Sequence, residues 1–145
     1  MIKLDSNRWL LNGGFPVIWD EARWPNFSRA ELSCRHCGEY IHDIDFLDAL
    51  QAVRDHMHRS MRILSAHRCA LHNARVGGAP LSQHLGMAVD VALSTHDRRD
   101  LVARCREAGF TGFGYYTTFI HLDMGRPRFW YGSEKAKKAW QTFLD

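Results

Sequence analysis

The sequence predicts an α+β protein with a small, mostly antiparallel sheet and flanking helices. Apolar residues alternate at 88–93 and again at 119–124, as they do in half-buried strands. Apolar residues recur at helical spacing at about 44–58, at about 96–108 and after Ser133. Because these segments follow no regular βαβ order, antiparallel pairing is expected.

Polar residues mark where these helices begin and end. Ser28 and Glu31 form a capping box, which predicts a short helix after Phe27. Asp43 caps the 44–58 helix, and either Ser94 or Thr95 caps the next one, which Gly109 ends. The remaining expected elements are a strand at 61–65, a helical turn at 70–75, a hairpin joining 112–116 to 119–124, and a strand at 129–131. In the last helix the inward residues are expected to be Ala136, Ala139, Trp140 and Phe143.

The 145 residues suit a single domain over 1–145. Residues 1–25 are rich in Trp, Gly and Pro and are expected to form an irregular arm, while 133–145 form the terminal helix. A net charge of +3 with dispersed basic residues argues against a nucleic-acid-binding protein. The sequence shows neither a membrane span nor a signal peptide, so we expect cytoplasmic synthesis.

Four cysteines occur, and two of them, Cys34 and Cys37, have the spacing of a metal knuckle or a redox pair. No second pair at ligand spacing follows along the chain. Reduced, partly buried thiols are therefore the favoured interpretation, and a structural zinc site is the alternative.

Two His–Asp pairs stand at strand-like stretches, His84 with Asp90 and His121 with Asp123. His121 and Asp123 share one face of their strand, because alternate side chains of a strand point to the same side. Two histidines and one carboxylate make a three-ligand catalytic zinc set, and this mixed N/O set suits zinc better than Mg²⁺ or Ca²⁺.

Several motifs occur in a fixed order between residues 26 and 131. They are Phe27-Ser28-x-x-Glu31-Leu32, Ser65-Ala66-His67-Arg68, Ser82-x-His84, Gly86-x-Ala88-x-Asp90 and Phe119-Ile120-His121-Leu122-Asp123. This ordered set resembles the D-alanyl-D-alanine carboxypeptidase family of zinc metallopeptidases. That family includes phage L-alanyl-D-glutamate endolysins, and the hedgehog signalling domain shares its fold.

The resemblance implies a Zn²⁺ cofactor bound by His84, Asp90 and His121. It implies that Arg68 holds a substrate carbonyl or carboxylate and stabilises the oxyanion; a salt bridge at a strand end is the alternative role. Ser82 is placed near the ligands. Tyr115 and Tyr116 are candidates to line the cleft, and core packing of one of them is equally compatible with the pattern.

Two positions depart from the family. Leu85 alone separates His84 from Gly86, where the family has two residues, and Thr118 stands where several members carry the acidic general base. Asp123 is the nearest substitute base. The alternative role for Asp123 is to orient His121 or to pair with Arg126 or Arg128.

The resemblance implies metal-assisted hydrolysis of peptide bonds in peptidoglycan stem peptides, by a phage or prophage endolysin or a cell-wall carboxypeptidase. Bound zinc would polarise the scissile carbonyl and lower the pKa of its water to about 7. We expect a monomer that is released to the cell wall, with a holin-type pore as export partner. A non-catalytic zinc-binding module that recognises cell-wall peptide or a protein partner is the alternative. The scissile bond, and carboxypeptidase against endopeptidase action, stay open at this point.

Overall fold

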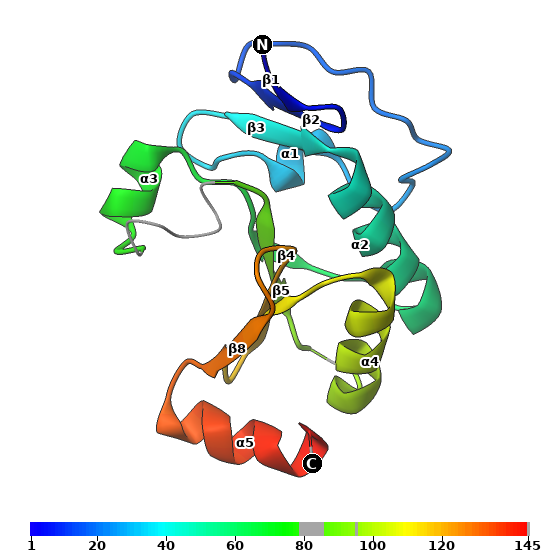
Figure 1. The fold of residues 1–145 in the computed structure, drawn as a ribbon, viewed down its shortest axis with the longest axis vertical. Coiled ribbons are helices and arrows are strands. Elements are labelled where there is room, and N and C mark those ends of the chain that lie inside the picture. The colour runs from blue at the N-terminus through cyan, green and yellow to red at the C-terminus, as the bar shows by residue number, and fades with distance from the viewer. Residues whose placement is uncertain (79–85, 95, 145) are drawn as a thin grey trace.

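The computed structural model describes residues 1–78, 86–94 and 96–144. Within these ranges two sheets and five helices make an α+β fold, as expected from the sequence (Figure 1). A three-stranded antiparallel sheet has the order β1-β2-β3, and a five-stranded sheet has the order β4-β5-β7-β6-β8. All pairs in the larger sheet are antiparallel except β6 with β8.

The strands are short. Their bounds are β1 Ile2–Asp5, β2 Arg8–Leu11, β3 Tyr40–Asp43, β4 Ile63–Ser65, β5 Ala88–Ala92, β6 Gly112–Tyr115, β7 Phe119–Asp123 and β8 Arg128–Tyr131. The hairpin formed by β6 and β7 and the strand β5 confirm the alternation seen in the sequence. β1 and β2 correct the expectation of an irregular arm, since residues 2–11 form a hairpin. All four residues of β1 are exposed, so this strand depends on backbone pairing, which leaves no apolar pattern in the sequence.

The helices are α1 Arg29–Leu32, α2 Ile44–Met57, α3 Ala70–Arg75, α4 Arg98–Ala108 and α5 Glu134–Leu144. The capping box at Ser28 and the Asp43 cap are both present. The cap of α4 differs from the expected Ser94 or Thr95: Asp97 accepts a hydrogen bond from the N–H of Asp100, and α4 begins two residues later than expected. Thr95 lies outside the described residues.

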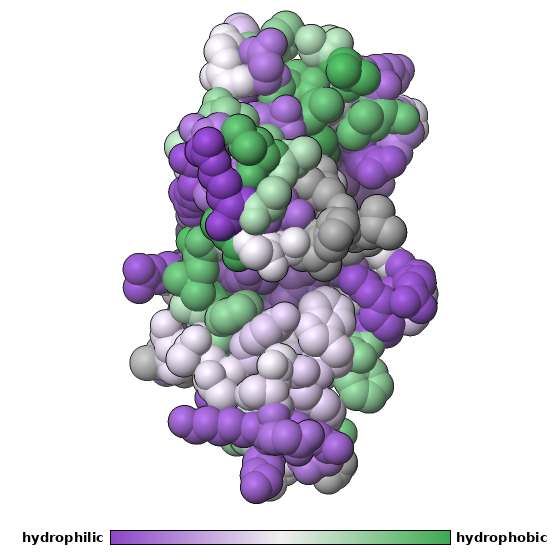
Figure 2. Space-filling model, turned by 90° about the vertical axis from the view of Figure 1, so that its left-hand side faces the viewer, coloured by the Kyte–Doolittle hydropathy of each residue, from purple (hydrophilic) through white to green (hydrophobic). Residues whose placement is uncertain are grey.

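One apolar core joins the two sheets to the helices. It runs from Leu11 through Leu50 and Leu101 to Trp140, and α2 packs against α4 (Figure 1). In α5, Trp140 is fully buried as expected, whereas Phe143 is 38% exposed. The lysines of α5 are exposed, and hydrophilic side chains gather at that end of the molecule (Figure 2).

The two faces of the five-stranded sheet differ in character. Strand registry places Tyr115 beside Ile120 on the core face, and Gly114 beside His121 on the other face. Asp90 pairs with His121 across β5 and β7, and Trp130 pairs with Gly114 across β8 and β6. The face opposite the core therefore carries the polar candidates for chemistry.

Candidate metal centre

The centre of the polar face is the imidazole of His121, on β7. Its Nδ1 atom lies 3.3 Å from Oδ1 of Asp90, and its Nε2 atom lies 2.6 Å from Oδ2 of Asp123. The side chain is only 7% exposed, and the two carboxylates hold it in this largely water-excluded position. The two nitrogens thus face different carboxylates, and this fixes the orientation of the ring.

Asp123 is fully buried and is bound from three directions. Its Oδ1 accepts hydrogen bonds from the Gly125 N–H at 2.9 Å and from Arg128 Nη1 at 2.8 Å. Its Oδ2 accepts from Arg128 Nη2 at 2.8 Å and contacts His121. Burial alone raises the pKa of Asp123, but the hydrogen bonds from Arg128 and His121 outweigh it and hold the pKa well below its ordinary value. Asp123 is therefore a carboxylate near neutral pH.

The pKa of His121 is shifted in the opposite direction. Burial by itself lowers the pKa of His121, but the hydrogen bonds to Asp123 and Asp90 outweigh burial and raise it. A metal ion can bind Nδ1 only when that nitrogen is deprotonated. The other nitrogen, Nε2, keeps its proton and donates it in the hydrogen bond to Asp123. Such a carboxylate on the far nitrogen is the usual support for a metal-binding histidine.

The spacing of Asp90 and His121 fits one zinc ion. Ligands about 2.1 Å from a tetrahedral ion lie about 3.4 Å apart, and the observed separation is 3.3 Å. A nitrogen and a carboxylate oxygen are donors that zinc accepts readily. The third expected ligand, His84, and the expected substrate-binding residue Ser82 lie outside the described residues.

Arg68 follows β4, whose Ser65 pairs with Asp90 in the sheet. Its Nη1 donates to Asn73 Oδ1 at 3.1 Å, and its buried Nε has no partner among the described residues. A Cβ at Gly78 would lie 2.7 Å from Arg68 Nη1, so a glycine there leaves room for the guanidinium.

His67, next to Arg68, is a buried link that the sequence did not reveal. Its Nδ1 lies 2.8 Å from the carbonyl of Gly86, and its Nε2 lies 2.8 Å from Glu39 Oε1. This side chain connects the end of β4 to the residue that precedes β3 and to the start of β5. It thereby ties the end of β4 to the segments that lead into β3 and β5.

Tyr115 does not line the centre. It is 1% exposed, lies on the core face of the sheet and packs against Trp140 at a ring distance of 4.8 Å. The expectation that it contacts substrate is corrected by this position. Tyr116 points to the opposite side of the strand and is half-buried.

An aromatic wall, formed by Tyr116, Phe119 and Trp130, stands beside His121. Trp130 lies 5.0 Å from the His121 ring and donates from Nε1 to the Tyr116 hydroxyl at 3.0 Å. Tyr116 stacks on Phe119 at 4.3 Å. The sequence indicated a strand at 129–131, but only the strand registry shows that Trp130 faces the histidine.

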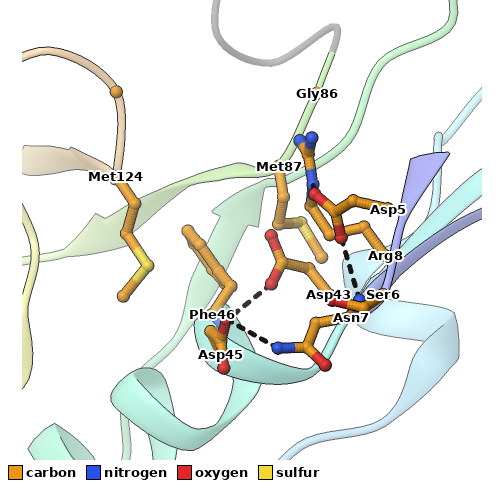
Figure 3. Close-up of a pocket in the computed structure, with 11 residues that line it drawn as sticks. Asp5, Ser6, Asn7, Arg8, Asp43, Asp45, Phe46, Gly86, Met87 and Met124 are labelled. Atoms are coloured by element: carbon orange, nitrogen blue, oxygen red, sulfur yellow. Dashed lines mark hydrogen bonds and ion pairs between the residues drawn. The ribbon is translucent and has the colours of Figure 1, made fainter.

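The largest described pocket lies elsewhere, between β1, β2 and the start of α2 (Figure 3). Its carboxylates serve the local backbone and neighbouring side chains: Asp43 caps α2, Asp5 accepts from the Asn7 N–H, and Asp45 accepts from the Asn7 side chain. None of the expected site residues that belong to the described ranges lines it. This pocket is therefore not the candidate centre.

Comparison with known families decides the assignment. The model of the family described as Peptidase M15 matches residues 25–123. This chain belongs to the Peptidase M15 family. The match covers the ordered motifs, including Arg68, Asp90 and His121, and confirms the resemblance seen in the sequence. No curated protein matches the chain.

Membership of Peptidase M15 makes the chain a peptidase, and peptidases of this family are typically zinc-dependent. The fold of the described residues agrees with a small α+β peptidase. No helix in the described part of the chain is long and apolar enough to cross a membrane.

Proposed function

We propose that this chain is a zinc-dependent peptidase that hydrolyses the stem peptides of bacterial peptidoglycan, as a phage or prophage endolysin or a cell-wall carboxypeptidase. One observation carries the proposal: His121 presents Nδ1 to Asp90 at 3.3 Å while Asp123 holds Nε2 at 2.6 Å. That geometry supports two neighbouring zinc ligands with a carboxylate that holds the far nitrogen.

In this proposal His84, Asp90 and His121 bind the ion. The ion would polarise the scissile carbonyl of the substrate and lower the pKa of a bound water. Asp123 orients His121 rather than acting as the general base, because both of its oxygens already accept hydrogen bonds and it is fully buried. The geometry thus favours the orienting role among the two that the sequence left open.

Arg68 binds the substrate carbonyl or carboxylate. Its Nη1 donates to Asn73 Oδ1 at 3.1 Å, and this contact holds the guanidinium directly after β4. A donor of this kind contributes about 3 kcal/mol when it stabilises a developing oxyanion. The aromatic wall beside His121 gives the substrate an apolar surface on the same side of the sheet.

The cellular setting belongs to the same proposal. The enzyme would be made in the cytoplasm, act as a monomer and reach the cell wall after release through a holin-type pore. It would bind no nucleic acid, in keeping with its small net charge of +3.

Digestion of purified peptidoglycan tests the function. We expect the wild-type protein to release new amino and carboxyl ends, which mass spectrometry of the soluble fragments assigns to one stem-peptide bond. His121→Ala should give no fragments, whereas His56→Ala, a change of an exposed histidine on α2, should leave the rate unchanged. Zinc bound at the Asp90–His121 centre without hydrolysis of any wall fraction would overturn the proposal in favour of a non-catalytic binding module.

A further inference from the structure

Three cysteines from two distant segments meet near the surface of the molecule, where Cys34 is buried, Cys69 is half-buried and Cys37 is exposed. Cys34 and Cys37 follow α1, and Cys69 precedes α3, yet their three sulfur atoms all lie within 4.8 Å of one another. All three are free thiols. Cys69 is therefore the partner that Cys34 and Cys37 lacked in the sequence.

The backbone around Cys34 curls as a metal knuckle does. The Gly38 N–H donates to the Cys34 carbonyl at 2.9 Å, and the Cys34 N–H donates to the Glu39 carbonyl at 2.8 Å. Gly38 has φ +78°, in the left-handed region that favours glycine. This tight turn brings the thiols of Cys34 and Cys37 to one side.

Backbone N–H groups point at two of the sulfurs. The Cys69 N–H donates to Cys34 Sγ at 3.4 Å, and the His72 N–H donates to Cys69 Sγ at 3.4 Å. The form of cysteine that binds metal is the thiolate, and a thiolate sulfur accepts hydrogen bonds from backbone N–H groups placed in this way.

The group itself consists of the three sulfurs, and an imidazole lies beside it, with its Nε2 3.3 Å from Arg75 Nη1. His36 Nδ1 lies 3.7 Å from Cys69 Sγ. A sulfur and a nitrogen bound to one tetrahedral zinc ion lie about 3.6 Å apart, and two sulfurs about 3.8 Å apart. The His36 ring stacks on that of His72, with their planes 3° apart, and this contact holds it against α3.

We propose that Cys34, Cys37, Cys69 and His36 form a second, structural zinc site that is built from residues other than the Asp90–His121 centre. Four protein ligands of this type close a structural zinc site and leave no position for water. The ion would tie α3 to the turn after α1. Because Cys69 directly follows Arg68, the site would also fix the backbone that presents the guanidinium. This inference does not depend on peptidase activity.

Metal content of a protein without the first centre tests the site. In Asp90→Ala/His121→Ala protein, purified under reducing conditions, we expect about one zinc ion per chain. Cobalt exchange should give thiolate-to-metal charge-transfer absorption, which an N/O site does not produce. Cys34→Ser in the same background should abolish both signals. Cys105→Ala, which changes a buried cysteine outside the cluster, should keep them.

Reaction of the intact Asp90→Ala/His121→Ala protein with a thiol reagent gives a readout that does not require the Cys34→Ser protein to fold. We expect Cys34, Cys37 and Cys69 to react only after a chelator is added. Absence of metal together with immediate reaction of all three thiols would overturn the site, as would a disulfide between any two of them. His36→Ala should weaken zinc retention more than His72→Ala, and the reverse order would overturn the assignment of His36.

Discussion

His121 Nε2 lies 2.6 Å from Asp123 Oδ2, in a pair that Arg128 closes from the other side. The pair joins two residues of one strand, so the backbone of β7 sets the distance between them. The imidazole is thereby oriented before any metal arrives, with Nδ1 facing Asp90.

Asp123→Asn tests this orienting role. The substitution keeps the shape of the side chain but removes the charge that holds the Nε2–H of His121 and the Arg128 guanidinium. We expect zinc affinity at the His121 centre to fall by about 10- to 100-fold, measured by competition with a chelator. Asp100→Asn, on an exposed surface pair with Arg104, is the matched control and should leave the affinity unchanged. Unaltered affinity in Asp123→Asn would assign Asp123 a role other than support of His121.

Gly114→Ala tests the packing of Trp130 against His121. A Cβ at position 114 would lie 2.6 Å from Trp130 Cζ2 and 2.9 Å from His121 Cβ, so one ring must move. We expect a loss of about 1–3 kcal/mol in the free energy of unfolding, measured by urea denaturation, and a lower rate of hydrolysis. Gly14→Ala, whose Cβ would meet nothing closer than 3.8 Å, should behave like the wild-type protein. Equal stability of the two variants would contradict the described contact.

Leu50→Ala tests the core that supports both sheets. Leu50 is fully buried on α2, and its truncation leaves a cavity. The free energy of unfolding should fall by about 2–5 kcal/mol in chemical denaturation. Leu71→Ala, at a leucine that is 51% exposed, should change it by less than about 0.5 kcal/mol. A smaller loss for Leu50 than for Leu71 would be incompatible with this core.

Asp48 gives a prediction about pH. Hydrogen bonds from Arg23 lower the pKa of Asp48, burial raises it less, and the indole of Trp24 adds a further lowering contact. The pKa is lower in the folded than in the unfolded chain, so this contact stabilises the fold above the ordinary Asp pKa of about 3.9 and is lost as the pH falls below it.

Asp48→Asn should therefore cost about 0.2–1 kcal/mol at pH about 7, a small amount because both charged side chains are over 40% exposed. The difference from the wild-type protein should shrink in urea denaturation at pH about 3. Exposed Glu21→Gln serves as the control. A difference that grows on acidification would have the wrong sign for this account.

The sequence predicted those elements whose apolar residues recur with the period of a strand or of a helix. The β5 and β7 strands, the α2 helix and the Asp43 cap all followed from such local patterns. The β1 strand did not, because its side chains are exposed on both faces and leave no periodic signal.

Within the candidate site, the sequence pointed to Asp90, His121 and Asp123, which the fold brings together. The sequence did not show that Tyr115 lies outside the site. Only the registry of β6 with β7 shows which of the two adjacent tyrosines faces the core. Trp130 was missed for the same reason. Cys69 was missed because it stands alone in the sequence, 35 positions after Cys34, and only the fold brings the two cysteines together.

The most direct test of the central claim compares zinc content and peptidoglycan hydrolysis in wild-type and His121→Ala proteins, with near-ultraviolet circular dichroism to verify that both are folded. We expect the variant to lose about one zinc ion per chain and all release of new amino ends. A folded His121→Ala protein that cleaves peptidoglycan at the wild-type rate would contradict a catalytic zinc centre on Asp90 and His121.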